Sequence, residues 1–236
     1  MQPTSTPKSI RVPSELAYLL GLLLMSLAVS MTAAADFGVS MIVAPAYLVS
    51  LKVSFLTFGQ AEYILQGILF ILFCILMRRV RPIYFVSFFT CLLYGLILDL
   101  WRAIVPLLNP NVTTPGSMSL PLRIFLLVAG MVITSFAVAL FFHVYLYPQV
   151  YDFFVKGLTV RYHLNVTVFK TAFDFSCLAV SVLLSRLLFH AWVGIGIGTV
   201  VMTVFNGVLI GLFDRVFRRF CTFRPLLPKF AELFRF

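Results

Sequence analysis

The sequence predicts an all-α membrane protein, with about six transmembrane helices arranged as two inverted three-helix repeats. Three observations predict this class: a composition too poor in charge for a soluble surface, six apolar segments of membrane-spanning length, and a weak internal repeat. Of the 236 residues, 61% are hydrophobic and only 11% are charged. Soluble domains carry about 25% charged residues, so a water-soluble fold is excluded.

Each of the six apolar segments is close to the roughly 20 residues that a helix needs to cross a bilayer. In chain order they are residues 16–35, 57–77, 83–107, 122–146, 166–189 and 191–213. Backbone groups in lipid need internal partners, and long apolar runs without alternation satisfy them as helices rather than as a barrel. The first segment is interpreted as a retained helix, because it is longer than the apolar part of a typical signal peptide.

The formal net charge of +10 is distributed unevenly between the two predicted sides of the membrane. Lys170 lies within a predicted span. If the N-terminus is cytoplasmic, four basic residues lie on the outer side of the membrane, Lys52, Arg102, Arg123 and Arg186, and all the other lysines and arginines lie on the cytoplasmic side. The positive-inside rule accounts for this bias without a nucleic-acid partner. Both termini are therefore predicted to be cytoplasmic, and the basic and aromatic tail suits an anionic membrane surface.

The two halves of the chain resemble each other weakly but in the same order. Residues 26–31 resemble 135–140, residues 51–57 resemble 158–165, and residues 95–99 resemble 211–214. Thr57 and Asn165 are equivalent in this comparison, and both are favoured N-cap residues; Thr57 also has capping-box spacing to Gln60. Because each half holds three spans, the second half must insert upside down, as in many transporters.

The predicted organisation follows from this repeat. It comprises a cytoplasmic tail (1–14), a first repeat (15–108), an external loop (109–121), a second, inverted repeat (122–217) and a cytoplasmic tail (218–236). The connectors 36–56 and 147–164 are too apolar for ordinary loops, and Pro45 is expected to interrupt any long helix. They are either interfacial helices or re-entrant segments; the re-entrant interpretation is favoured for the first and the interfacial one for the second.

Ionisable groups inside the membrane are costly and are therefore candidates for function. Glu62 and Gln66 share one face of the second predicted span, and Lys170 and Asp174 share one face of the fifth. Glu62 and Lys170 occupy equivalent repeat positions, so the four residues are predicted to line a binding site for a small polar solute between the repeats. A structural alternative is that Lys170 reaches the interface or pairs locally with Asp174.

Two further carboxylates end the third and sixth predicted spans. Asp99 is followed by Arg102, and Asp214 by Arg218, at the spacing of neighbours on a helix. Interfacial ion pairs are the favoured interpretation, and a carboxylate gate at each end is the alternative.

The sequence holds no catalytic signature and no nucleotide-binding motif. Its four cysteines and three histidines lack the spacing of a metal site. Gly194, Gly196 and Gly198 are interpreted as a close-packing stripe on the sixth helix. We therefore expect no enzymatic activity, no cofactor and no metal.

Three stretches carry a family resemblance: DFGVSMIVAPAY at 36–47, LTFGQAEY at 56–63 and YGLILD at 94–99. With these stretches the chain resembles the YczE/YitT-like bacterial membrane proteins from residue 16 to about residue 217. The resemblance implies a bacterial inner-membrane protein of several spans, and it assigns no substrate and no functional residue.

The leading functional hypothesis is a transporter-like protein that binds a small polar solute between its repeats. The alternatives are a substrate-binding membrane subunit of a multi-component importer and a non-transporting scaffold or assembly factor. The expected partners are the lipid bilayer, the solute, and either a second copy of the chain or a separate ATPase.

Overall fold

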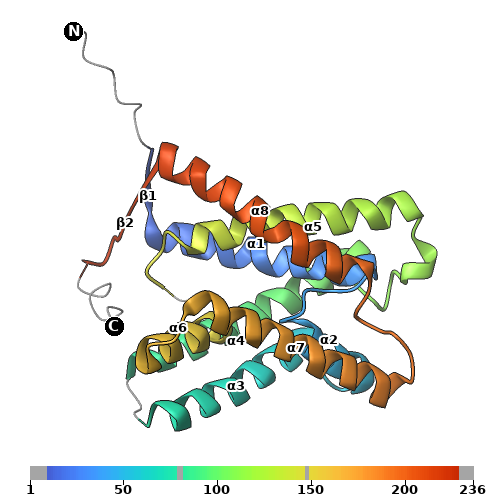
Figure 1. Ribbon diagram of the computed structural model, residues 1–236. Coiled ribbons are helices and arrows are strands. Elements are labelled where there is room, and N and C mark those ends of the chain that lie inside the picture. The colour runs from blue at the N-terminus through green and yellow to red at the C-terminus, as the bar shows by residue number, and fades with distance from the viewer. Residues whose placement is uncertain (1–9, 79–81, 147–148, 229–236) are drawn as a thin grey trace.

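The computed structural model describes residues 10–78, 82–146 and 149–228, which form eight α-helices and one two-stranded sheet (Figure 1). Six helices are long and apolar enough to cross a membrane, as predicted. They are α1 (Ser14–Ala35), α3 (Phe58–Met77), α4 (Pro82–Ile104), α5 (Leu120–Phe141), α7 (Val166–Phe189) and α8 (Ile197–Phe220). Two short 3-10 turns, η1 (Pro106–Leu108) and η2 (Pro115–Ser117), lie in the loop between α4 and α5.

The starts of α3 and α7 are set by the two predicted caps. The Thr57 hydroxyl accepts a hydrogen bond from Gln60 N at 3.1 Å, and Gln60 Oε1 accepts one from Thr57 N at 3.0 Å. Asn165 Oδ1 accepts hydrogen bonds from Thr167 N and Val168 N at 3.0 and 3.2 Å. These side chains satisfy amides that lack partners in the first turn of a helix, so both N-cap predictions are confirmed.

The predicted bounds of the sixth span are wrong. Gly194 has a φ of +70°, which stops a helix there, and α8 begins only at Ile197. The glycines around the start of α8 pack against the segment that follows α1. Gly198 N donates to Phe37 O at 2.7 Å, and Val39 N donates to Gly194 O at 3.1 Å. The glycine stripe therefore serves close backbone packing, but only Gly198 lies in the helix.

The connectors contain two short helices, α2 (Ala44–Lys52) and α6 (Val150–Tyr162), and both are largely buried. No long helix runs through Pro45, as expected, because it lies in the first turn of the short helix α2, where no backbone N–H is needed. It marks the start of that helix.

The helix α6 runs alongside the second half of α3. Its first residue, Val150, donates its amide to Gln66, its Gly157 packs against the Phe73 ring, and its Tyr162 hydroxyl donates to Leu76 O at 2.9 Å. The second connector therefore forms a helix packed along α3, and whether it lies in the interface or re-enters the membrane stays a prediction.

The centre of the bundle is the contact between α1 and α5, the two most buried spans. α4 packs against α1, α8 packs against α5, α3 packs against α6, and α2 packs against α7. Figure 1 shows α1, α5 and α8 on one side of the molecule and α3, α6 and α7 on the other. The outer faces of α7 and α8 are largely exposed and apolar, as expected of surfaces that face lipid.

A parallel pair of strands joins the two ends of the described chain. β1 (Ile10–Pro13) pairs with β2 (Cys221–Arg224), with Ile10 opposite Cys221 (Figure 1). Next to this pair, the Glu15 carboxylate accepts hydrogen bonds from the amides of Leu226 and Leu227 and from the Tyr145 hydroxyl, at 2.8 to 3.0 Å. Apolar length and periodicity give no indication of this short sheet.

Candidate functional site

The candidate site begins with two polar residues of α3. The capping box fixes the start of α3, so Glu62 and Gln66 fall on the face that packs into the bundle, and both side chains are fully buried. Gln66 Nε2 donates a hydrogen bond to Glu62 Oε2 at 3.2 Å. The predicted pairing of these two residues on one helix face is therefore present, although no structural contact tests their predicted role.

The start of α6 completes this polar cluster from the second half of the chain. The Tyr151 hydroxyl donates to Glu62 Oε2 at 3.1 Å, and Val150 N donates to Gln66 Oε1 at 3.0 Å. The second bond fixes the orientation of the Gln66 amide, so that its NH₂ group faces Glu62. The N-terminal end of α6, which carries a partial positive charge, therefore lies beside the carboxyl group.

Tyr151 is suited to act as a hydrogen-bond donor. Burial, and to a smaller extent the charge of Glu62, raises the pKa of the Tyr151 phenol well above its ordinary value. The hydroxyl therefore keeps its proton over the whole physiological pH range and offers it to Glu62 Oε2.

Several polar atoms of the cluster have no hydrogen-bond partner among the described residues. They are Glu62 Oε1, the Tyr94 hydroxyl of α4 and Gln149 Nε2 just before α6. Gln149 lies close enough to Tyr94 to interact with its hydroxyl, but the geometry falls short of a full hydrogen bond. Buried polar groups are rarely left unpaired, so these atoms point to a ligand site.

The cluster contains a carboxyl group and no opposite charge. None of the ion pairs within the described part of the chain includes Glu62. Its electrostatic neighbours are a thiol and a phenol on α4, Cys91 and Tyr94, with Tyr151 on α6 and Cys177 on α7. All of these groups are neutral at ordinary pH.

Lys170 and Asp174 lie on the neighbouring helix α7 and do not join this cluster directly. Lys170 Nζ lies 3.5 Å from Asp152 Oδ1 of α6, with both side chains about half exposed. It makes no ion pair with Asp174 or Glu62 within the described ranges, so the predicted local pair of Lys170 with Asp174 is not formed. Asp174 Oδ1 is buried and has no hydrogen-bond partner.

Asp99 binds the start of α3 instead of forming the predicted ion pair with Arg102. Its carboxylate accepts hydrogen bonds from the Thr57 hydroxyl at 2.5 Å and from Gly59 N at 2.8 Å. Arg102 lies over the Phe58 ring, 5.3 Å from its centroid. The carboxylate binds one amide and one hydroxyl at the start of α3. The spacing of Asp99 and Arg102 along one helix could not indicate this partner.

The corresponding pair in the second half is present. Asp214 lies 2.9 Å from Arg218 Nε, one helical turn further along α8. His143 Nε2 also lies 3.0 Å from Asp214, although without hydrogen-bond alignment. Whether this group acts as a gate stays a prediction.

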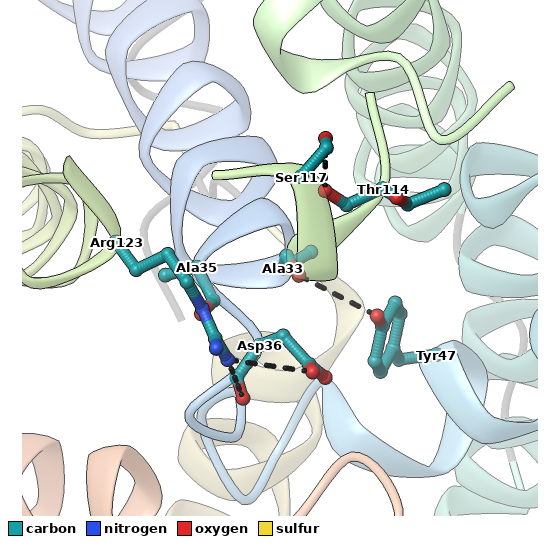
Figure 2. Close-up of polar contacts among 7 residues, drawn as sticks. All are labelled: Ala33, Ala35, Asp36, Tyr47, Thr114, Ser117 and Arg123. Carbon is teal, nitrogen blue, oxygen red and sulfur yellow. Dashed lines mark hydrogen bonds and ion pairs between the residues drawn. The ribbon is translucent and has the colours of Figure 1, made fainter. Parts of the chain in front are cut away.

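Arg123 forms a contact that the sequence analysis missed. It donates from Nε to Ala35 O at 2.9 Å and from Nη2 to Asp36 O at 3.0 Å, which satisfies carbonyls at the end of α1 (Figure 2). Its guanidinium also lies 4.6 Å from the centroid of the Phe37 ring. The charge count placed Arg123 outside the membrane, but it gave no indication of this partner.

A surface pocket of about 270 Å³ lies between the segment after α1 and the segment before α8. It is lined by Asp36, Phe37, Gly38, Trp192, Gly194, Ile195, Gly196 and Ile197. It shares no residue with the Glu62 cluster, and Asp36 is the one charged residue of this lining. We therefore place the candidate site at Glu62. No group of three or more potential metal ligands occurs within the part of the chain that the structure describes.

Sequence reasoning found Glu62 and Gln66 but missed Tyr151, Gln149 and Tyr94. The signal for Tyr151 was present, since it belongs to a connector too apolar for a loop. Its partner could not be deduced, because the packing of α6 against α3 is a tertiary contact.

Six membrane-length helices around a buried polar cluster define a multi-pass membrane protein. The chain belongs to the family of unknown function DUF6198, whose family model matches residues 12–215. No curated protein and no solved structure shows a significant match to the chain.

Proposed function

We propose that this chain is a small transporter-like protein that binds a small polar solute between two inverted halves. The observation that carries the proposal is the buried cluster in which Tyr151, from the second half, binds Glu62, from the first. Fully buried polar groups in a membrane protein are costly, and they commonly mark a substrate or ion pathway.

The pattern of helix contacts supports the inverted halves. The first helices of the two halves, α1 and α5, pack against each other. The contact of α4 with α1 corresponds to the contact of α8 with α5, and the contact of α3 with α6 corresponds to the contact of α7 with α2. The repeat also has an asymmetry, since α3 packs along α4, whereas a Cβ atom at Gly211 of α8, the equivalent of Gly95, would meet no other part of the described structure within 4 Å. Such a difference between halves is expected when a transporter is open to one side.

The second connector fits a re-entrant segment in this proposal. α6 follows α3 along its length and brings a helix N-terminus to Glu62. Half-helices that end beside a binding site are a recurring feature of transporters. The proposal also places both termini in the cytoplasm and the chain in a bacterial inner membrane, related to the YczE/YitT-like proteins, without enzymatic activity or a cofactor.

A thermal-shift screen against small polar metabolites in detergent tests the proposal. A solute at about 100 times its Kd should stabilise the folded chain by about 2.7 kcal/mol. Glu62→Gln and Tyr151→Phe should weaken or abolish this stabilisation, and Asp36→Asn, far from the cluster in sequence and bound to Arg123, serves as the control. A hit that shifts all three variants equally would place the solute elsewhere, and the absence of any hit would favour a scaffold.

The importer-subunit alternative is distinguished by its partner. Purification in mild detergent should yield a monomer or homodimer if the chain works alone. Stoichiometric recovery of an ATPase chain would favour the alternative.

A further inference from the structure

The two carboxyl oxygens of Glu62 have different surroundings. Oε2 accepts hydrogen bonds from Gln66 Nε2 and from the Tyr151 hydroxyl, whereas Oε1 is equally buried and has no partner among the described residues. An ionised carboxylate oxygen is an acceptor only, and a buried charge without a donor is costly. A proton bound to Oε1 would remove this charge.

No other group facing Glu62 supplies a compensating charge. The titratable groups around it are Cys91 and Tyr94 on α4, Tyr151 on α6 and Cys177 on α7. Thiols and phenols in water titrate above neutral pH, whereas carboxyl groups titrate below it.

The titratable side chains of α2, which also packs on α3, are engaged elsewhere. The Tyr47 hydroxyl donates to Ala33 O at 3.5 Å, and Lys52 Nζ donates to Leu188 O at 2.9 Å. The described residues contain no group of three or more His, Cys, Asp or Glu side chains that could hold a metal ion. A proton is the smallest cation, and the Oε1 atom is fully buried.

Both protonation states of Glu62 find support in this environment. Burial away from water favours the neutral acid. The two donors on Oε2 and the N-terminal end of α6 favour the carboxylate. A group that is supported in both states is suited to take up and release a proton.

A second carboxyl group with an unpartnered, buried oxygen belongs to Asp174 of α7. Asp174 Oδ1 is buried without a hydrogen-bond partner. Asp174 follows Lys170 by one helical turn on α7. Lys170 Nζ lies 3.5 Å from Asp152 Oδ1, and both side chains are about half exposed. Asp152 is the chain neighbour of Tyr151, whose hydroxyl binds Glu62, so polar side chains follow one another from the surface towards Glu62.

We propose that Glu62 reversibly binds a proton at Oε1 and that Asp174 relays this proton between Glu62 and the exposed pair of Lys170 and Asp152. In the uptake step an O–H bond forms at Glu62 Oε1 as a proton is taken from bulk water through Asp174, and release reverses it. This inference rests on the proposed function, and it makes the proton the coupling ion of the same site.

Infrared difference spectroscopy of the chain in lipid nanodiscs, stepped between about pH 8 and about pH 5, tests the proposal. The wild-type chain should show the carbonyl band of a buried, protonated carboxyl group. Glu62→Gln should lose this band, and Asp36→Asn should keep it. Tyr151→Phe removes one donor from Oε2 and should shift the band, which provides a second readout if Glu62→Gln fails to fold.

The relay is tested by the rate at which this band appears after a pH step. Asp174→Asn should slow its appearance and leave its final amplitude unchanged. A band that persists in Glu62→Gln, an unchanged rate in Asp174→Asn, or a response to sodium or potassium at constant pH would overturn the proposal. If solute binding depends on Glu62 but no band is seen, the proton inference fails and the proposed function stands. If the band is present but no solute binds, the proposed function fails and the proton inference stands.

Discussion

Gln66 holds two helices together through both ends of its amide. Replacement by leucine would leave Val150 N without an acceptor and Glu62 Oε2 with a single donor, all in a buried site. Each unsatisfied buried group costs about 1–3 kcal/mol, so Gln66→Leu should lower the free energy of unfolding by at least this amount. Thermal or denaturant unfolding in detergent measures the loss.

Ser87 offers a matched control for this substitution. Its hydroxyl is also buried, but it has no hydrogen-bond partner in the described structure. Ser87→Ala should therefore leave stability unchanged or raise it slightly. Equal destabilisation by both substitutions would show that the contacts of Gln66 contribute nothing beyond the filling of space.

Arg123 closes the end of α1 with two hydrogen bonds and stacks on Phe37 (Figure 2). Lysine keeps the charge but cannot reproduce the planar, forked donor geometry. Arg123→Lys should cost about 1–3 kcal/mol in an unfolding assay, because hydrogen bonds from charged donors are the stronger ones.

Asp36→Asn is the comparison for Arg123→Lys. The Asp36 carboxylate contacts Arg123 only at 3.5 Å, and its side chain is half exposed. Exposed ion pairs contribute between about 0 and 1 kcal/mol, so this substitution should be nearly neutral in the same unfolding assay. A larger loss for Asp36→Asn than for Arg123→Lys would contradict the assignment.

At the scale of elements, the contact of α3 with α4 depends on the absence of a side chain at Gly59. A Cβ atom there would overlap Gly95 O and would lie 2.6 Å from Asp99 Oδ2. Gly59→Ala must therefore push the two helices apart, and the start of α3 would lose its bonds to Asp99. Overpacking costs about 1–3 kcal/mol, and a backbone contact leaves little room to relax.

Gly207 provides the control for Gly59. It lies in α8, and a Cβ atom there would meet nothing within 4 Å. Gly207→Ala should be neutral or stabilising by up to about 1 kcal/mol, because alanine is the better helix former. Unfolding midpoints of the two variants, measured side by side, separate a steric effect from a general intolerance of substitution.

The length of the apolar segments predicted five of the six spans well. It failed at the sixth span, where the apolar segment and the helix have different bounds. The segment 191–196 is apolar but not helical, since Gly194 adopts a positive φ and the chain there bonds to residues 37–39. Residues 214–220 include several charged side chains and still belong to α8, because the solvent-exposed face of a helix accepts arginine. Neither effect is visible in a hydrophobicity count.

The site was predicted in part for a similar reason. The spacing of Glu62 and Gln66 gave their shared face, because four residues make about one helical turn. The same rule paired Lys170 with Asp174, and there a partner from α6, Asp152, is closer. Contacts within one helix are encoded locally, whereas contacts between helices depend on packing that a single sequence does not display.

At the scale of the whole molecule, the strand pair and Glu15 connect both ends of the described chain. A chain that stops after Phe220 loses β2 and the amides of Leu226 and Leu227, which leaves the Glu15 carboxylate with Tyr145 alone. Loss of these charge-assisted hydrogen bonds should lower the free energy of unfolding by about 1–3 kcal/mol. A chain that stops after Pro228 keeps every one of these contacts and should be more stable than the chain that stops after Phe220 by this amount.

The strand pair also orders the events of synthesis. β1 is synthesised before the six spans described above, whereas β2 follows all six of them. At typical rates of about 5–20 residues per second, the first strand waits on the order of ten seconds or longer before its partner exists. Until then β1 has no partner strand, so this part of the fold forms only after all six of these spans have been synthesised.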